Sequence, residues 1–454
     1  MTLQPPPKNH LARLLLATAA LTACTPVQGV RPAPPVTTVT VTDRPADASR
    51  DSIPLPPPPA EREVRGVWVV RTTLSDPEGV RRMVRETHEA GFNTLLVQVR
   101  GRADAFYRST FEPRAPQLSG APAEFDPLAV VISEAHARGM EVHAWVVAQL
   151  VWGVGPLPED PDHLVNLRPD WLAVPRELAE ELYDMNPFVP EYRERVHAWA
   201  VANRERVEGL FSSPSHPEAR ERLAVVVEEL LARYPLDGIH LDYLRYPSPE
   251  FDYSRRTLED FRAWAVGRVP PGRSASMDAR VRGGDVTAWT RENPELWDSW
   301  RESQVTATLR AVRAVVDAAS GEPRLTAAVF ADPVDALRGR FQDWPEWLAG
   351  GWVDAVAPMA YTPDDARFAD LMEAARRADV SAGGRRVWAG VGIYQTDLEG
   401  ALRKVDLARA AGTAGFVLFS YDWATTEGTA GEGEPYLGAL ARRAFPRNAR
   451  EPVR

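Results

Sequence analysis

Short apolar runs alternate with amphipathic segments over most of this 454-residue chain. Between most of the apolar runs, hydrophobic residues recur at helical spacing, as in 77–91 and 397–412. Gly91 and Gly412 end these two segments shortly before the next apolar run, where a left-handed helix cap is expected. The pattern predicts eight strands, at 64–71, 93–100, 141–147, 237–244, 324–330, 354–361, 386–394 and 414–421.

Eight strands that alternate with helices favour a parallel sheet closed into a barrel and covered by helices. The alternative is an open doubly wound sheet, which usually has fewer strands, and no G-x-G-x-x-G follows the first strand here. We therefore predict an α/β fold of the (β/α)8, or TIM barrel, class. Two connections are unusually long, 148–236 after the third strand and 245–323 after the fourth, and loops in these positions carry the active sites of barrel enzymes.

The first sixty residues differ in composition from the rest of the chain. Basic residues precede an uncharged apolar segment, 14–23, which ends directly before Cys24. This pattern is typical of a secretory signal peptide, and a cysteine after small residues resembles a bacterial lipobox. We predict a signal peptide over 1–23 and an acylated Cys24 that anchors the exported protein to a membrane of the bacterial envelope.

The rest of the chain divides by composition into three parts. Residues 24–60 are rich in proline without helical period, which indicates an extended linker. The barrel domain is predicted over 61–447, and 448–454 form a tail. Cys24 is the only cysteine, so intrachain disulfides are excluded. The formal net charge of −10 argues against nucleic acid as a partner.

Ionisable side chains stand inside several of the predicted strands. Because side chains alternate along a strand, His240 and Asp242 share the face opposite Ile239 and Leu241 and point into the barrel. The same rule points His143 and Trp145 of the third strand inward, as well as Gln98 and Arg100 of the second. A buried charge is costly unless it is paired or used, and three neighbouring strands that share this feature favour a functional site.

A carboxyl group near the carboxyl end of a barrel strand suits glycoside hydrolysis, which needs one acid and a second carboxylate. Asp242 is the best single candidate for the principal catalytic residue. Asp332, just past the fifth strand, is the candidate partner, while Asp104, Asp364 and Asp422 follow other strands and remain alternatives.

Two other chemistries compete with glycoside hydrolysis as interpretations of these residues. His143, His240 and Asp242 could together bind a catalytic zinc, although the sequence has no H-E-x-x-H. Serine or cysteine nucleophiles are disfavoured because no G-x-S-x-G is present and Cys24 is used for lipidation. The prediction includes no metal and no cofactor.

Several long stretches resemble one known protein family. They are EVRGVWVV (63–70), GFNTLLVQVRGRADAFYRS (91–109), FDPLAVVISEAHARGMEVHAWV (125–146), DGIHLDYLRYP (237–247) and GFVLFSY (415–421). Their sequence and order resemble the glycosyl-hydrolase-like 10 family over about 61–447. The resemblance implies a TIM barrel, an exported and often lipid-anchored bacterial protein, and glycosidase activity, in at least one branch on peptidoglycan glycan strands.

The resemblance and the strand pattern select overlapping residues. We expect Asp242 and Asp332 to be catalytic, and a polysaccharide to be the partner. The side chains expected to bind the substrate are Arg100, Asp104, His143, Trp145, His240, Arg245, Tyr246, Tyr361 and Tyr394. A non-catalytic glycan-binding protein is the alternative, because Met359 stands where the family pattern has glutamine.

Overall fold

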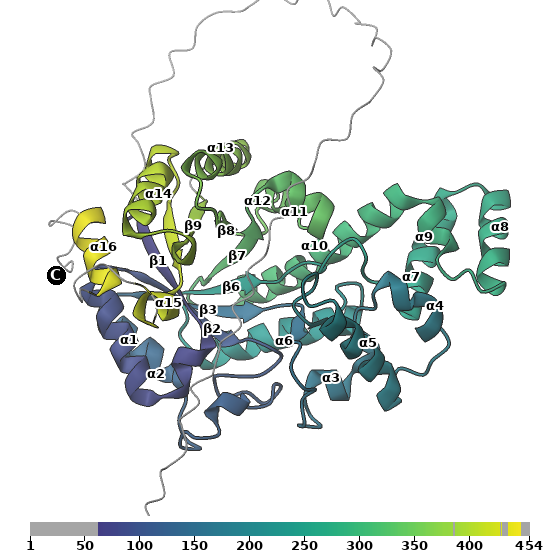
Figure 1. The fold of residues 1–454 in the computed structure, drawn as a ribbon, viewed down its shortest axis with the longest axis horizontal. Coiled ribbons are helices and arrows are strands. Elements are labelled where there is room, and N and C mark those ends of the chain that lie inside the picture. The colour runs from purple at the N-terminus through teal and green to yellow at the C-terminus, as the bar shows by residue number, and fades with distance from the viewer. Residues whose placement is uncertain (1–61, 385, 427, 429–434, 446–454) are drawn as a thin grey trace, which may run out of the picture. The chain divides into compact units, whose positions relative to one another are not determined.

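The structure is a computed structural model that describes residues 62–445, apart from 385, 427 and 429–434. The predicted signal peptide, Cys24, the proline-rich linker and the tail at 448–454 lie outside the described residues. Within the described part, the chain folds as a barrel with a large insertion between some of its strands (Figure 1).

All eight predicted strands form, and they close into a parallel barrel in the order β1-β10-β9-β8-β7-β6-β3-β2. The strands are β1 (Val64–Val69), β2 (Thr94–Arg100), β3 (Glu141–Val147), β6 (Gly238–Asp242), β7 (Arg324–Phe330), β8 (Ala355–Met359), β9 (Trp388–Gly392) and β10 (Gly415–Phe419). The prediction of a (β/α)8 barrel is confirmed.

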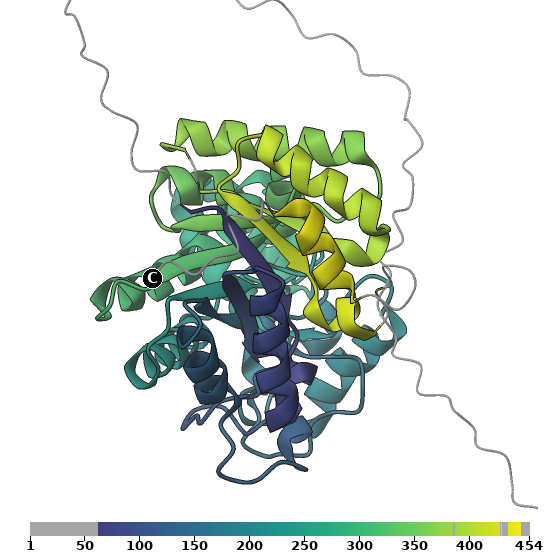
Figure 2. The ribbon, with the colours of Figure 1, turned by 90° about the vertical axis from the view of Figure 1, so that its left-hand side faces the viewer.

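Helices cover the outside of the barrel, as Figures 1 and 2 show. They are α1 (Pro77–Glu89), α2 (Pro127–His136), α6 (Pro217–Arg233), α10 (Pro294–Ala318), α11 (Pro333–Arg340), α12 (Trp344–Ala349), α13 (Asp365–Ser381), α14 (Leu398–Ala410), α15 (Tyr421–Thr426) and α16 (Tyr436–Ala444). Aspartate side chains cap several of these helices; Asp76 accepts from the backbone N–H groups of α1 and Asp397 from that of Gly400 in α14. Gly91 and Gly412 have φ angles of 82° and 77°, as predicted for left-handed helix caps.

The two long connections build a lobe beyond the barrel strands (Figure 1). Its elements are β4 (Leu150–Trp152), which pairs antiparallel with β5 (Leu210–Phe211), and α3 (Leu164–Leu167), α4 (Ala179–Leu182), α5 (Pro190–Ala202), α7 (Arg255–Ala265), α8 (Pro271–Arg282) and α9 (Ala288–Glu292). Short 3-10 turns lie at Arg71–Ser75, Pro116–Leu118, Pro169–Trp171, Arg176–Leu178, Val266–Arg268 and Ile393–Gln395.

The lobe has a hydrophobic core of its own. Trp289, Trp297 and Trp300 are 2%, 2% and 4% exposed and pack with Phe261 and Tyr253. The rings of Trp297 and Trp300 are stacked with their centroids 5.4 Å apart. These tryptophans therefore hold the lobe together, and do not line an open groove.

The barrel interior is so closely filled that one glycine is required. A Cβ atom on Gly238 of β6 would lie 2.4 Å from Nδ1 of His143 and 2.7 Å from the carbonyl oxygen of Arg324. We expect Gly238→Ala to lower the free energy of unfolding by about 1–3 kcal/mol, the usual cost of overpacking. Urea unfolding measures this change.

Gly120→Ala is the matched control, because a Cβ there meets no atom of the described residues within 4 Å. In the double variant His143→Ala/Gly238→Ala, the two costs should be less than additive, since the clash with the imidazole is removed while that with the carbonyl of Arg324 remains. A Gly238→Ala protein as stable as the natural one would show that the interior is looser than described.

Candidate active site

His240 lies inside the barrel and links strands on opposite sides of it. Its Nε2 accepts a hydrogen bond from the indole N–H of Trp68 at 3.1 Å, and its Nδ1 lies 2.9 Å from the hydroxyl of Thr326. Burial lowers the pKa of His240 well below its usual value, so the ring is neutral. The ring is fully buried, and its two nitrogens are occupied by protein partners. His240 is therefore part of the packed interior, with both of its hydrogen-bonding groups paired within the protein.

Asp242 lies two residues after His240 on the same face of β6, at the carboxyl end of the strand. One carboxylate oxygen accepts from the indole N–H of Trp145 at 3.1 Å, and the other from the backbone N–H of Tyr243 at 2.7 Å. Burial raises the pKa of this carboxyl to about 6, against the hydrogen bonds and the charge of Arg245, which lower it. The group is thus protonated in part of the population near neutral pH.

Aromatic side chains from the ends of several strands surround the mouth of the barrel. The Tyr361 ring lies 5.4 Å from that of Phe419 and 5.9 Å from that of Tyr394, between centroids. The ring centroids of Trp145 and Phe419 are 6.4 Å apart. Burial raises the pKa of Tyr361, and the nearby charge of Asp242 raises it further. The four rings of Trp145, Tyr361, Tyr394 and Phe419 are called the aromatic wall below.

Arg245 and Glu208 form an ion pair beside Asp242. Nη2 of Arg245 donates to a carboxylate oxygen of Glu208 at 2.9 Å, and the guanidinium lies 4.5 Å from the ring centroid of Tyr243. Burial of Glu208 would raise its pKa, but the charge of Arg245 and the hydrogen bonds to the carboxylate together outweigh this effect, so the pKa is lowered. The Glu208 side chain is 38% exposed, and its charge is among those that raise the pKa of Asp242.

Asp332, the expected catalytic partner, is used as a helix cap. One of its carboxylate oxygens accepts from the backbone N–H groups of Val334 and Asp335 at 3.0 and 3.3 Å, and the other pairs with Arg367 at 3.0 Å. Partial burial alone would raise its pKa, but Arg367 and the two N–H groups lower it. The pairing of Asp332 with Asp242 stays a prediction.

Other predicted substrate-binding residues are held within the protein. Arg100 is 2% exposed, pairs with buried Glu112 at 3.4 Å and donates to the carbonyl of Val147, which ties β2 to the end of β3. Asp104 is 2% exposed and accepts from the backbone N–H of Arg102 at 2.8 Å.

Two more of the predicted residues lie in packed interiors. His143 is deeper in the barrel than Trp145 and meets the ring of Trp388 at 5.4 Å, edge on. Tyr246 is fully buried and packs against Phe341 with centroids 5.6 Å apart. In the structure, neither ring faces the mouth beside Asp242.

Two of the alternative carboxylates also have structural partners. Asp364 caps α13 through the backbone N–H groups of Ala366 and Arg367. Asp422 accepts from the backbone N–H of Val70 at 2.8 Å, which ties the end of β10 to β1.

The zinc alternative gains no support from the placement of its ligands. Nε2 and Nδ1 of His240 are engaged by Trp68 and Thr326, and His143 lies against Trp388. Across residues 62–445, in the part that the structure describes, no group of three or more His, Cys, Asp or Glu side chains could hold a metal ion.

The raised pKa of Asp242 makes stability depend on pH. Its folded pKa, about 6, exceeds the unfolded value of 3.8, so the ionised form is disfavoured by folding. Stability is therefore highest below the unfolded value and falls as pH rises through 6, by up to about 3 kcal/mol for two pKa units. The natural protein should lose this stability between pH 4 and 7.5, whereas Asp242→Asn should not. The difference in unfolding free energy between the two proteins, measured by urea unfolding at each pH, should therefore change by this amount in favour of Asp242→Asn.

Asp332→Asn is the matched control, because its pKa is shifted in the opposite direction. A lowered pKa contributes stability above the unfolded value, so this variant should lose stability at pH 7.5 relative to the natural protein, and the loss should shrink toward low pH. A difference between Asp242→Asn and the natural protein that does not change with pH would contradict the raised pKa.

A closed parallel barrel with a buried carboxyl group and an aromatic wall at the carboxyl ends of its strands is of the TIM-barrel class that holds its active site at this end. The family model described as Glycosyl hydrolase-like 10 matches residues 63–399. The chain belongs to this glycosidase-like family.

Curated relatives carry glycosyl hydrolase names. The chain is 28% identical to glycosyl hydrolase YngK of Bacillus subtilis over 207 residues, which are 41% of this chain and 34% of that protein. It is 24% identical to glycosyl hydrolase DigH of Escherichia coli K12 over 363 residues, 73% of this chain and 71% of that protein. The aligned part thus spans about a third of YngK and most of DigH.

Solved structures with the same fold include a glycoside hydrolase domain and a β-galactosidase. The glycoside hydrolase domain of PgaB (BpsB) from Bordetella bronchiseptica superposes with a TM-score of 0.51 at 14% identity, over 84% of this chain and 98% of that one. A β-galactosidase from Marinomonas ef1 gives a TM-score of 0.54 at 13% identity, over 84% and 58%. At such identities the likeness establishes the fold alone.

Sequence reasoning missed Glu208 and Phe419. The alternation of side chains along β10 would have predicted Phe419, because Phe419 shares a face with Val417 and is the last residue of the strand, at the mouth. Glu208 stands in an irregular segment just before the two-residue strand β5, where no period assigns a direction to its side chain.

Proposed function

We propose that this protein is a glycoside hydrolase that cleaves an exported polysaccharide, with the glycan strands of peptidoglycan as its substrate. The observation that carries the proposal is Asp242, a carboxyl group with a pKa of about 6 beside an aromatic wall. A carboxylic acid with such a pKa can keep its proton near neutral pH and donate it to a glycosidic oxygen. Membership of a glycosidase-like family and the names of the relatives support it.

In the proposed reaction Asp242 is the general acid and Glu208 is the second carboxylate. The pKa of Asp242 is raised and that of Glu208 is lowered, so one group is protonated while its neighbour is ionised. Two carboxyl groups with pKa values pushed apart are the arrangement that divides acid from base or nucleophile. The glycosidic bond to oxygen would break as Asp242 gives its proton to the leaving oxygen. Glu208 would either activate a water that attacks the sugar carbon directly, or attack that carbon itself to form a glycosyl ester, which water then hydrolyses while Asp242 takes up a proton from it.

The surrounding side chains would bind and position these groups. Flat faces of Tyr361 and Tyr394 would pack against sugar rings, which have apolar faces of their own. Trp145 holds Asp242 through its indole N–H, and Arg245 keeps Glu208 ionised. The remaining predicted ligands, Arg100, Asp104, His143, His240 and Tyr246, would support the mouth from within.

We also propose that the protein works outside the cytoplasm, held to the envelope membrane by acyl chains on Cys24. The lipobox-like sequence before Cys24 and the proline-rich linker after it motivate this proposal. None of the helices in the described ranges is long and apolar enough to cross the bilayer. Cell fractionation of the full chain should find it in the membrane fraction, and a fully soluble protein would contradict the anchor.

The proposed activity is tested by incubating the purified protein with denuded peptidoglycan glycan strands and measuring new reducing ends. Release of reducing ends, unaffected by a metal chelator, is the expected result. The second candidate is a glycan-binding protein without turnover, which the 6% exposure of Asp242 favours. Co-sedimentation with the strands but no reducing ends would select that candidate, and loss of activity on chelation with recovery on adding zinc would select a metal-dependent hydrolase.

A further inference from the structure

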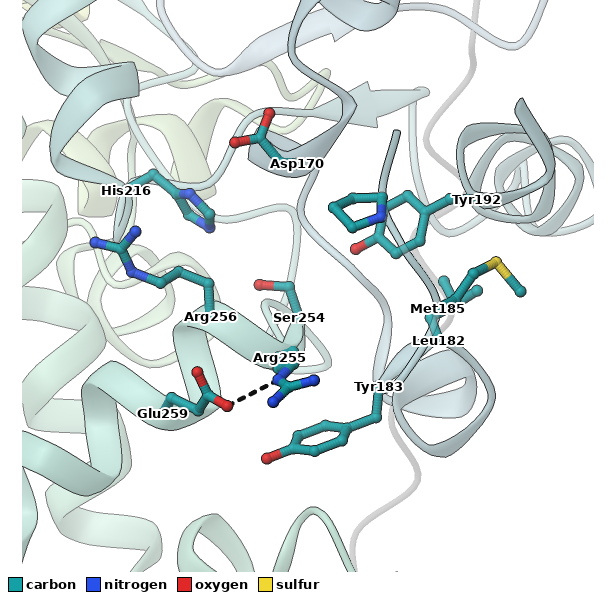
Figure 3. A pocket seen from close by; sticks show the side chains of 11 residues that line it. Asp170, Leu182, Tyr183, Met185, Tyr192, His216, Ser254, Arg255, Arg256 and Glu259 are labelled. Atoms are coloured by element: carbon teal, nitrogen blue, oxygen red, sulfur yellow. Dashed lines mark hydrogen bonds and ion pairs between the residues drawn. The ribbon is translucent and has the colours of Figure 1, made fainter. Parts of the chain in front are cut away.

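A pocket lies in the lobe, among residues that take no part in the barrel mouth. Its volume is about 180 Å³, and both long connections contribute to it (Figure 3). Tyr192 comes from α5, His216 precedes α6, and Ser254 and Arg256 come from the start of α7. Because the side chains belong to the lobe, the pocket is a site distinct from the one around Asp242.

His216 has a buried nitrogen that the protein leaves unpaired. The side chain is 2% exposed, and its Nε2 has no hydrogen-bond partner among the described residues. Burial lowers the pKa of His216, although the charges of Asp252 and Asp170 raise it, so the ring is neutral. A buried polar atom without a partner is costly, and a bound molecule would remove that cost. Figure 3 shows the ring between Asp170, Arg256 and Ser254.

The charged groups around the pocket are balanced and already paired. Arg255 pairs with Glu259 at 2.8 Å, and Arg256 pairs with Asp260 at 2.7 Å. Asp170 receives two hydrogen bonds from Arg168, at 2.9 and 2.7 Å. A free ion would find no uncompensated charge here, whereas a neutral ligand could bond to the outer edges of these groups.

Two tyrosines complete the lining. Tyr192 is 4% exposed, and Figure 3 shows its hydroxyl directed toward the space beside Ser254. The Tyr183 ring is partly exposed, and the guanidinium of Arg255 lies 5.3 Å from its centroid. Aromatic rings next to paired acidic and basic side chains offer both an apolar face and hydrogen-bond groups, which is what one neutral sugar ring requires.

We propose that this pocket binds one sugar unit of the polysaccharide, as an accessory binding site in the lobe. The choice of ligand rests on the proposed function, since a chain held at the barrel mouth could present another of its units here. The pocket is small compared with the ~300–1,000 Å³ of pockets for larger ligands, so it would hold a single ring. Two contacts along one chain strengthen binding of long strands far more than of short ones.

Binding is tested by calorimetry with the full chain carrying Asp242→Asn, to prevent turnover, and with denuded glycan strands as the probe. We expect Tyr183→Ala and His216→Gln each to weaken binding of long strands by about tenfold or more, within the range that a second contact supplies. Phe188→Ala is the matched control, because this side chain is 58% exposed in the same lobe but does not line the pocket. The control should bind as tightly as the parent.

The kinetic readout uses the same three changes in the otherwise natural protein. Tyr183→Ala should raise KM for long strands without changing kcat, and leave kcat/KM for a disaccharide substrate unchanged. Equal binding by all variants would overturn the proposal, as would displacement of the strands by inorganic phosphate, which would make the pocket an anion site. If Tyr183→Ala and His216→Gln weaken binding but the natural protein cleaves no glycan, the proposed binding site stands and the hydrolase function is rejected.

Discussion

Replacing Asp242 with asparagine will lower kcat/KM for cleavage of glycan strands by about 10²–10⁴-fold, the range that general acid catalysis supplies. Asparagine keeps the size of the side chain and can still accept from the indole N–H of Trp145, but it has no proton of suitable pKa to give. Reducing-end assays at saturating and limiting substrate measure the change. The loss should appear mainly in kcat, because the proton is needed only as the bond breaks.

The control for this variant is Asp364→Asn, a carboxyl group that caps α13 outside the mouth. It should keep its activity within about threefold and nearly all of its stability, because asparagine caps a helix about as well as aspartate. The Asp242→Asn protein should remain folded, with stability at pH 7.5 no lower than that of the natural protein. Undiminished cleavage by a folded Asp242→Asn protein would remove Asp242 from the mechanism.

The second large effect is expected at Glu208. Glu208→Gln should lower kcat/KM by about 10²–10⁴-fold, because the amide neither attacks the sugar carbon nor accepts a proton from water. The pH profile gives a sharper result than the rate alone. Asp242 loses its proton as pH rises through about 6, so kcat/KM should fall on the alkaline side, and Glu208, with its lowered pKa, should set the acid side.

In Glu208→Gln the acid-side fall should disappear while the alkaline-side fall near pH 6 remains. If Glu208 is the nucleophile, azide should restore part of the activity of Glu208→Ala by taking the place of the carboxylate. A role only as the ion-pair partner of Arg245 would leave the acid-side fall in place and give no rescue. These two readouts separate direct chemistry from positioning.

Asp332→Asn decides between the two possible partners of Asp242. Its carboxylate bonds to the first N–H groups of α11 and to Arg367, so we expect a modest loss of stability and less than about threefold loss of activity. A large loss in Asp332→Asn, together with full activity in Glu208→Gln, would restore Asp332 as the partner and reject Glu208.

The sequence predicts the barrel well because each strand carries its own signal. Apolar runs, helix-capping glycines and the spacing of the helices are local features, and all eight strands form where they indicate. Strand alternation also predicts that His240 and Asp242 point inward, which their bonds to Trp68 and Trp145 confirm. Hydrogen-bond partners from distant strands decide which inward side chain is fully bonded and which is available for chemistry. The alternation of side chains along one strand does not predict these partners.

The residues that the sequence places least well lie after the strands, in the long connections. Tyr246 follows β6 closely, yet it turns into the core against Phe341. The position of Glu208 depends on two tertiary contacts. Strand β5, which follows Glu208 closely, pairs with β4, and Arg245 from the next connection forms an ion pair with the Glu208 carboxylate. Such positions are fixed by tertiary contacts, which hydrophobic patterning does not record.

We propose, above all, that the barrel mouth hydrolyses glycosidic bonds with Asp242 as the acid. The most direct test is cleavage of denuded glycan strands in water enriched in ¹⁸O, with mass spectrometry of the products. One ¹⁸O atom should enter each new reducing end with the natural protein, and Asp242→Asn should form almost no product. Products without ¹⁸O, or labelled products formed equally well by Asp242→Asn, would contradict it.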